Sequence, residues 1–141
     1  MSSQPLVLVV EDNEVNQLLT ASVLEREGFQ VALAGDSTQA MERLRERTPE
    51  LILMDVQLPG MDGLALTRRL KTNPATAQIT IVALTAHAMT GDREQTLAAG
   101  CAGYISKPID TRTFAGQVRA FLPRSAPGPG PAWTDATLSG T

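Results

Sequence analysis

The sequence predicts an α/β fold in which one five-stranded parallel sheet carries helices on both faces. Apolar runs of strand length alternate with helical stretches five times along the chain. Three of the runs are almost unbroken, which is typical of strands buried on both faces. The 141 residues provide one domain's worth of chain. Right-handed crossovers between parallel strands place the intervening helices on the two faces of the sheet.

The five strands are expected at the apolar runs, which cover residues 6–10, 29–34, 51–54, 79–84 and 103–105. A doubly wound sheet of this kind has the flavodoxin-like strand order 2-1-3-4-5, with the first strand inside the sheet, between the second and the third. Ligands then bind at the carboxyl ends of the strands, near the point where the strand order reverses.

The five helices are expected between and after the strands, over residues 14–27, 37–47, 64–71, 92–99 and 111–122. Their ends carry residues that start or stop helices. Left-handed C-terminal positions are expected at Gly28 and Gly100. Free N-terminal amides are expected to be capped by Asp36 or Ser37, Asp62 and Asp110. Prolines follow two of the helix ends, at Pro49 and Pro74.

The amino-acid composition changes after Leu122, where prolines and glycines become frequent. Residues 1–122 are therefore expected to form the domain and residues 123–141 a tail or linker. Prolines and glycines interleave there, at Pro123, Pro127, Gly128, Pro129, Gly130 and Pro131. The only tryptophan, Trp133, also lies in this segment. It is either an anchor or an exposed aromatic without a role.

Composition excludes several classes of function. The formal net charge is -3, so no global positive field favours direct binding to nucleic acid. A single cysteine, Cys101, makes neither an internal disulfide nor a zinc site and fits the reducing cytosol. The apolar run at residues 6–10 is too short for a signal peptide or a membrane span, so no membrane association is expected.

Five polar residues stand at or just after the carboxyl ends of predicted strands and should meet at one rim of the sheet. They are Glu11, Asp12, Asp55, Thr85 and Lys107. Three carboxylates in one cleft repel one another unless a hard divalent cation, here Mg²⁺, neutralises them. A lysine and a hydroxyl opposite them suit the oxygens of a phosphoryl group. Asp55 would then be the nucleophile that forms an acyl phosphate.

Each of these residues also has a purely structural explanation. Asp12 alone suits a helix N-cap, Thr85 a β-branched strand residue and Lys107 a solvated surface charge. Their joint placement favours a site. A flavin-binding electron carrier of the same fold is disfavoured, because Glu11 and Asp12 would repel its phosphate. A phosphatase that uses an aspartyl phosphate would carry its nucleophile after the first strand and a second carboxylate two residues later, where Glu14 lies in a helix.

Four segments together resemble the receiver domain of two-component response regulators, of the CheY-like and DivK-like single-domain kind and of the kind found in hybrid histidine kinases. They are Val10-Glu-Asp-Asn-Glu-Val-Asn16, Leu53-Met-Asp-Val-Gln-Leu-Pro-Gly-Met-Asp-Gly63, Ala83-Leu-Thr-Ala-His-Ala-Met89 and Tyr104-Ile-Ser-Lys-Pro-Ile109. The resemblance spans residues 6–122 and implies the flavodoxin-like receiver fold. It leaves open a receiver that is never phosphorylated and acts only as a binding module.

The resemblance also implies a role for each residue of the cleft. Asp55 accepts a phosphoryl group from a phosphohistidine of a histidine kinase or a histidine phosphotransfer protein. Lys107 and Thr85 bind the phosphoryl oxygens. Mg²⁺ is held by Asp12, Asp55 and the main-chain carbonyl of Gln57, with Glu11 acting through water. The output is a change in contacts with a downstream protein, made by a monomer or a weak dimer.

Further residues are assigned to switching and to the lifetime of the phosphoryl group. The resemblance implies that Thr85 moves toward the phosphoryl group while Tyr104 turns inward, and that the peptide bond before Pro108 is cis. Gln57 and His87 lie two residues past Asp55 and Thr85 and should flank the phosphoryl group. We expect them to shield it from water, although an amide at Gln57 is also able to orient an attacking water.

The first helix has two apolar sides. At about 100° per residue, Leu19, Val23 and Leu24 turn toward the sheet, whereas Val15, Leu18 and Ser22 fall on another side, next to the acidic cleft. An exposed apolar strip at Val15 and Leu18 is suited to docking a helical partner, and in the resembling family histidine phosphotransfer and kinase helices dock here. The alternative is that these side chains pack against neighbouring loops.

Overall fold

A five-stranded parallel sheet forms the centre of the molecule, in the order β2-β1-β3-β6-β7. The computed structural model describes residues 4–58, 61–85 and 90–122, with only the backbone at positions 57, 58, 61, 62 and 90–93. The strands are β1 (Leu6–Val10), β2 (Gln30–Ala34), β3 (Leu51–Asp55), β6 (Thr80–Thr85) and β7 (Gly103–Ser106). The predicted fold class and strand order are therefore confirmed.

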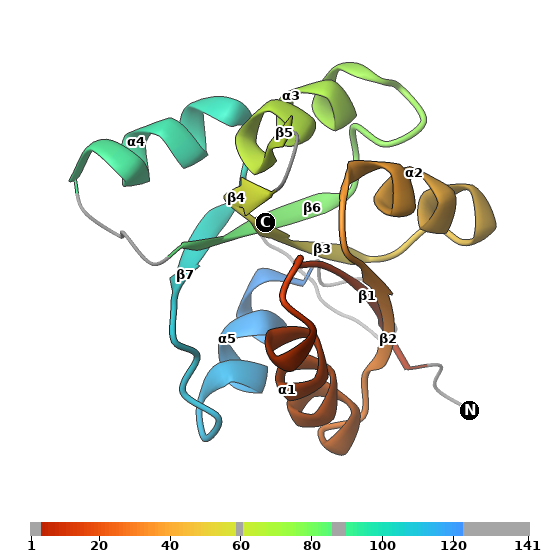
Figure 1. The fold of residues 1–141 in the computed structure, drawn as a ribbon, viewed down its shortest axis with the longest axis vertical. Helices are drawn as coiled ribbons and strands as arrows, with labels where there is room; N and C mark the ends of the chain where they lie inside the picture. Colours follow the sequence, from red (N-terminus) through yellow and green to blue (C-terminus); the bar gives the residue numbers. More distant parts are fainter. Residues whose placement is uncertain (1–3, 59–60, 86–89, 123–141) are drawn as a thin grey trace, which may run out of the picture.

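Helices cover both faces of the sheet, as Figure 1 shows. The helices α1 (Glu14–Arg26) and α5 (Phe114–Phe121) lie on one face. The helices α2 (Ser37–Glu46), α3 (Gly63–Thr72) and α4 (Thr90–Ala99) lie on the other. Among the described residues, no helix combines the length and the apolar character that crossing a membrane requires.

Two apolar clusters hold these layers together, one on each face of the sheet. Val7 and Val9 of β1 belong to the cluster under α1 and α5. Leu8 and Val10 belong to the cluster under α2, α3 and α4. Because successive strand residues point to opposite faces, the unbroken apolar run of β1 is buried on both sides. This double burial fixes the position of the segment that follows β1.

The expected helix boundaries are mostly confirmed. Gly28 and Gly100 have φ angles of 95° and 111°, in the left-handed region that favours glycine. Asp36 caps α2, since its side chain accepts a hydrogen bond from the amide of Gln39. Asp62 immediately precedes α3, but its side chain lies outside the described part of the chain.

Two local features differ from the expectations. A small antiparallel pair, β4 (Gln57–Leu58) and β5 (Met61–Asp62), follows β3 and was not predicted. The helix expected from residue 111 begins instead at Phe114. Asp110 therefore caps the turn before α5, accepting from the amide of Arg112, and not the helix itself. The expected tail at residues 123–141, with Trp133, lies outside the described residues.

Candidate functional site

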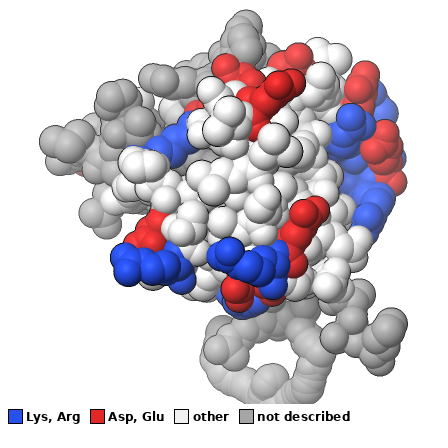
Figure 2. Space-filling model, turned by 60° about the horizontal axis from the view of Figure 1, so that its bottom comes forward, with Lys and Arg blue, Asp and Glu red and all other residues white. Residues whose placement is uncertain are grey.

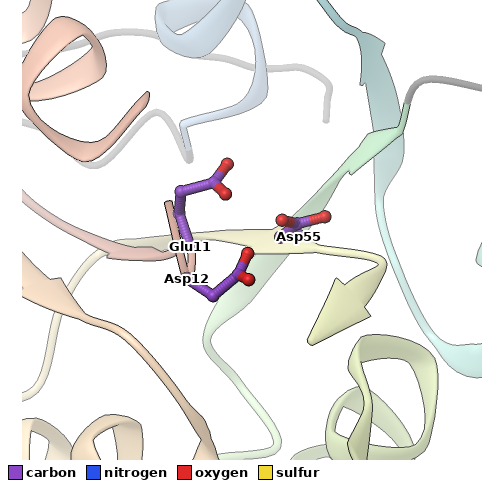
Figure 3. Close-up of side chains that lie close together, drawn as sticks. All are labelled: Glu11, Asp12 and Asp55. Carbon is purple, nitrogen blue, oxygen red and sulfur yellow. The ribbon is translucent and has the colours of Figure 1, made fainter. Parts of the chain in front are cut away.

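Three carboxylates converge at the carboxyl ends of the central strands. Glu11 and Asp12 follow β1, and Asp55 is the last residue of β3. The two strands are neighbours, with Val10 beside Met54, so their ends bring the three side chains together (Figure 3). One carboxylate oxygen of each residue lies within 4.8 Å of those of the other two.

Glu11 is the most buried of the three, with 2% of its surface exposed. Its backbone amide donates to the carbonyl of Ala34, which continues the pairing of β1 with β2 by one residue. Its carboxylate accepts from the amide of Asn13 at 3.2 Å and lies 3.0 Å from the Lys107 ammonium. Burial is tolerated because the charge has both a cation and an amide as partners.

Asp12 is exposed, and its carboxylate does not cap α1. The cap is Asn13, whose side-chain oxygen accepts from the amide of Asn16 at 3.0 Å. The structural explanation of Asp12 as a helix cap is therefore wrong. Its carboxylate is left facing the cleft beside Glu11 and Asp55.

Lys107 connects two of the three carboxylates. Its Nζ lies 3.0 Å from an oxygen of Glu11 and 3.2 Å from an oxygen of Asp55, which is only 4% exposed. Its backbone amide donates to the carbonyl of Thr85 at 2.8 Å, and the bond to Pro108 is cis. Burial alone lowers the pKa of Lys107, but hydrogen bonds and charge from the two carboxylates outweigh it and raise the pKa.

Thr85 and Tyr104 lie on the same face of the sheet. Thr85 ends β6 and is buried. Tyr104 pairs with Ala83, two residues before Thr85, and side chains two residues apart on a strand share a face. Tyr104 is half-buried against the cluster under α2, α3 and α4.

The side chain of Gln57 and all of His87, the residues assigned to phosphoryl lifetime, lie outside what the structure describes.

The donor set suits a hard divalent cation. All three candidate ligands are carboxylates, and oxygen-only sites are typical of Mg²⁺ rather than of Zn²⁺ or copper. Two of the carboxylates also contact Lys107, which offsets part of their mutual repulsion. The residues present therefore fit Mg²⁺.

An apolar strip on α1 lies next to the cleft. Val15 and Leu18 are 72% and 63% exposed. Leu19 was expected to face the sheet, but it is 41% exposed and lines a cavity of about 170 Å³ with Pro108 and Ile109, between α1 and the segment after β7. In Figure 2 the face of α1 and α5 is turned forward, and uncharged side chains occupy its middle while most charged ones lie toward its margins.

Two residues that bear on the cleft were not singled out from sequence, namely Asn13 and Gln17. The side chain of Gln17 donates to the backbone carbonyl of Glu11. An asparagine directly before the first helical residue is a recognisable signal for a cap. No comparable sequence signal exists for a glutamine that reaches back six residues.

Comparison with known proteins identifies the family. The response regulator receiver domain matches residues 7–119. This chain belongs to the response regulator receiver domain family. The polar-differentiation response regulator DivK of Brucella anthropi is 40% identical over 116 residues, which cover 82% of this chain and 94% of DivK. Receiver domains are signalling domains of two-component systems, so the chain is a signalling domain and not an enzyme of the ordinary kind.

Solved receiver domains share the fold. The receiver domain of a sensor histidine kinase from Pseudomonas aeruginosa, described with a magnesium ion coordinated in its active site cleft, is 34% identical. The match has a TM-score of 0.76 and covers 84% of this chain and 98% of that one. The receiver domain of a histidine kinase from Syntrophus aciditrophicus is 31% identical, with a TM-score of 0.75, and the match covers 84% of this chain and 89% of that one.

Proposed function

We propose that this receiver domain accepts a phosphoryl group on Asp55 from the phosphohistidine of a histidine kinase or a histidine phosphotransfer protein. The environment of the Asp55 carboxylate carries the proposal. It is buried at the end of β3, with the Lys107 ammonium 3.2 Å away and two further carboxylates beside it. Phosphoryl transfer to an aspartate requires a nucleophilic carboxylate, a nearby cation and a metal-binding acidic cluster.

In the proposed transfer, a carboxylate oxygen of Asp55 attacks the phosphorus. The bond between phosphorus and the histidine nitrogen breaks, and an acyl phosphate forms. Lys107 and Thr85 hold the phosphoryl oxygens, which their positions around Asp55 and at the end of the adjacent strand support. The chain would catalyse only its own phosphorylation and dephosphorylation.

Mg²⁺ is the proposed cofactor. The groups proposed to hold it are Asp12, Asp55, the main-chain carbonyl of Gln57 and, through water, Glu11. When bound, the ion supplies positive charge that offsets repulsion between carboxylates and phosphoryl oxygens. Without the ion, the two carboxylates raise the pKa of Lys107, which favours its ammonium form.

The output of the proposed cycle is a change in protein contacts. Thr85 and Tyr104 share a face of the sheet, so a shift of Thr85 toward the phosphoryl group would open space for the ring of Tyr104. Gln57 and His87 are retained as the side chains that shield the phosphoryl group from water.

The buried free thiol of Cys101 is consistent with a reducing compartment, so we place the protein in the cytoplasm.

The phosphodonor is proposed to dock on the apolar strip of α1. Three large apolar side chains of one helix, Val15, Leu18 and Leu19, are exposed next to the cleft. The cavity between Leu19 and the segment at Pro108 and Ile109 would accept an apolar side chain from a partner helix. Glu11 and Lys107 line the same cavity, so a partner helix seated there would lie beside the cleft that receives the phosphoryl group.

A phosphotransfer assay tests this function. A radiolabelled histidine phosphotransfer protein is mixed with this chain and Mg²⁺, and the label on each protein is followed. We expect the label to move to the wild-type chain, to be released by hydroxylamine as acyl phosphates are, and to stay on the donor when Asp55→Asn is used. A receiver that binds the donor but takes no label would be a binding module only, which contradicts the proposal.

A further inference from the structure

The side-chain amide of Gln17 contacts the backbone of the acidic loop, which is the segment Glu11-Asp12-Asn13 between β1 and α1. Gln17 lies in the first turn of α1, and its Nε2 donates to the carbonyl oxygen of Glu11. We propose that Gln17 is a positioning residue, which fixes the peptide between Glu11 and Asp12 so that the Asp12 carboxylate faces the cleft. The inference rests on the proposed function, since it concerns the affinity of the site for Mg²⁺.

The contact occupies the place where pairing between β1 and β2 stops. The amide of Glu11 donates to Ala34 of β2, and the N–H and C=O of a residue in a parallel strand point to the same side. The Glu11 carbonyl therefore faces the segment after β2. A Cβ atom at Gly35 would lie 3.6 Å from Nε2 of Gln17, so the amide sits between the ends of the two strands.

Fixing this carbonyl also constrains Asp12. The peptide unit is planar, so the orientation of the Glu11 carbonyl sets that of the Asp12 amide and the position of the Asp12 Cα, from which the side chain extends. Within the described part of the chain, no group is seen donating a hydrogen bond to the Asp12 carboxylate, whereas Glu11 has both Asn13 and Lys107 as partners. The position of the backbone at Asp12 therefore sets how readily its carboxylate reaches the place beside Glu11 and Asp55.

The chain offers a matched control on α2, the next helix along the sequence. Gln39 of α2 accepts from the amide of Gly35 through its Oε1, at 2.6 Å. Both side-chain amides lie near Gly35, but among the described residues no hydrogen bond joins Gln39 to Glu11. Gln39→Met and Gln17→Met each remove one hydrogen bond between a side-chain amide and the backbone, and only the second change removes the bond to the acidic loop.

The experiment measures the dissociation constant for Mg²⁺ of the unphosphorylated full chain by NMR titration of backbone amides. We expect Gln17→Met to weaken binding by about three- to tenfold, the equivalent of one net hydrogen bond, and Gln39→Met to leave it unchanged. Labelling of Gln17→Met by acetyl phosphate should be slow at low Mg²⁺ and return to the wild-type rate at saturating Mg²⁺. Gln17→Leu, which also lacks the donor, should behave alike.

Three outcomes would overturn the inference. Wild-type affinity in both Gln17 variants would do so while leaving the proposed function intact. An equal loss of Mg²⁺ affinity in Gln39→Met would also overturn it, because the loss would then not depend on the hydrogen bond to Glu11. If the wild-type chain itself binds no Mg²⁺, the inference fails together with the proposed metal site.

Discussion

At the scale of single residues, Asp12 is the exposed member of the acidic cluster, so its carboxylate is the most accessible to a metal ion. Asp12→Asn keeps the shape of the side chain and removes its charge. We expect Mg²⁺ affinity to fall by about tenfold or more and phosphorylation by acetyl phosphate to be lost, because ligand charge sets affinity for a hard cation. The free energy of unfolding without Mg²⁺ should stay the same or rise, since one repulsive charge is gone.

Titration calorimetry with Mg²⁺, together with the mass of the protein after incubation with acetyl phosphate, checks this prediction. Unchanged metal binding and phosphorylation in Asp12→Asn would remove Asp12 from the site. Glu14→Gln, an exposed change in the first turn of α1, is the control for the loss of one nearby negative charge.

Cys101 gives a prediction about pH. The thiol is 6% exposed, and burial raises its pKa, partly opposed by a hydrogen bond with Thr67 and by the charge of Lys71. The folded state therefore keeps the thiol proton more tightly than the unfolded state. Its effect on stability is absent below the pKa of the unfolded thiol, about 8.5, and stability falls as the pH rises above that value.

Urea unfolding at about pH 7 and about pH 9.5 measures this effect. The wild type should lose more stability between the two than Cys101→Ala, and the native thiol should react with iodoacetamide much more slowly than the unfolded one. An equal loss in both proteins would show that the thiol does not titrate differently in the two states.

Sequence reasoning at this scale succeeded where strand ends decide the outcome. Glu11, Asp12 and Asp55 were predicted to meet because parallel strands end at one edge of the sheet, and they do. The cap of α1 could also have been predicted. The helix was expected from residue 14, where α1 begins, and the residue directly before it is Asn13, a good capping residue.

At the scale of elements, α1 carries the proposed docking strip. Val15→Asp or Leu18→Asp places a charge where a partner would bury apolar surface. We expect phosphotransfer from a histidine phosphotransfer protein to slow by about tenfold or more, as for an interface anchor, with labelling by acetyl phosphate unchanged. Leu97→Asp is the control, since Leu97 is 47% exposed on α4, on the opposite face of the sheet.

Comparison of the two donors decides this prediction. The small donor requires only the cleft, whereas the protein donor also requires the helix. If both donors fail equally in Val15→Asp and Leu18→Asp, the strip supports the fold and is not a docking surface.

The start of α3 is packed against the end of β3. A Cβ atom at Gly63 would lie 1.9 Å from the backbone oxygen of Asp55, so Gly63→Ala must displace one of the two elements. We expect a loss of about 1–3 kcal/mol in the free energy of unfolding and slower phosphorylation of Asp55. Gly116→Ala in α5 is the control, because nothing lies within 4 Å of its added Cβ, and it should stabilise by about 0.5–1 kcal/mol.

Chemical denaturation of both glycine variants gives these values. Equal stability of Gly63→Ala and wild type would mean that, in solution, α3 lies far enough from β3 to accommodate a Cβ atom at position 63.

Element prediction worked best for the buried strands and least well at the edges of the fold. Apolar runs, of which the one at residues 103–105 is the shortest, identified every strand of the main sheet. The β4 and β5 pair was missed because two-residue strands carry no periodic pattern. The exposure of Leu19 was missed because helical periodicity gives a direction but not the neighbour that lies there, which is the open cavity near Pro108 and Ile109.

At the scale of the whole molecule, the parallel sheet determines where the site lies. The central strands β1 and β3 are buried on both faces, so their carboxyl ends are held in place by both apolar clusters. Alternation of strands and helices predicted this architecture because the pattern extends over the whole domain and does not depend on any one boundary. The phosphoryl-lifetime residue His87 and the segment 123–141 lie outside the described residues, and their expected roles stay predictions.

The central claim is that Asp55 is the phosphoacceptor, and the intact mass of the protein after incubation with acetyl phosphate and Mg²⁺ tests it most directly. We expect the wild type to gain the mass of one phosphoryl group and Asp55→Asn to gain none. Asp36→Asn, which changes the cap of α2 after β2, should be phosphorylated like the wild type. A phosphoryl group on Asp55→Asn, or none on the wild type, would contradict the account.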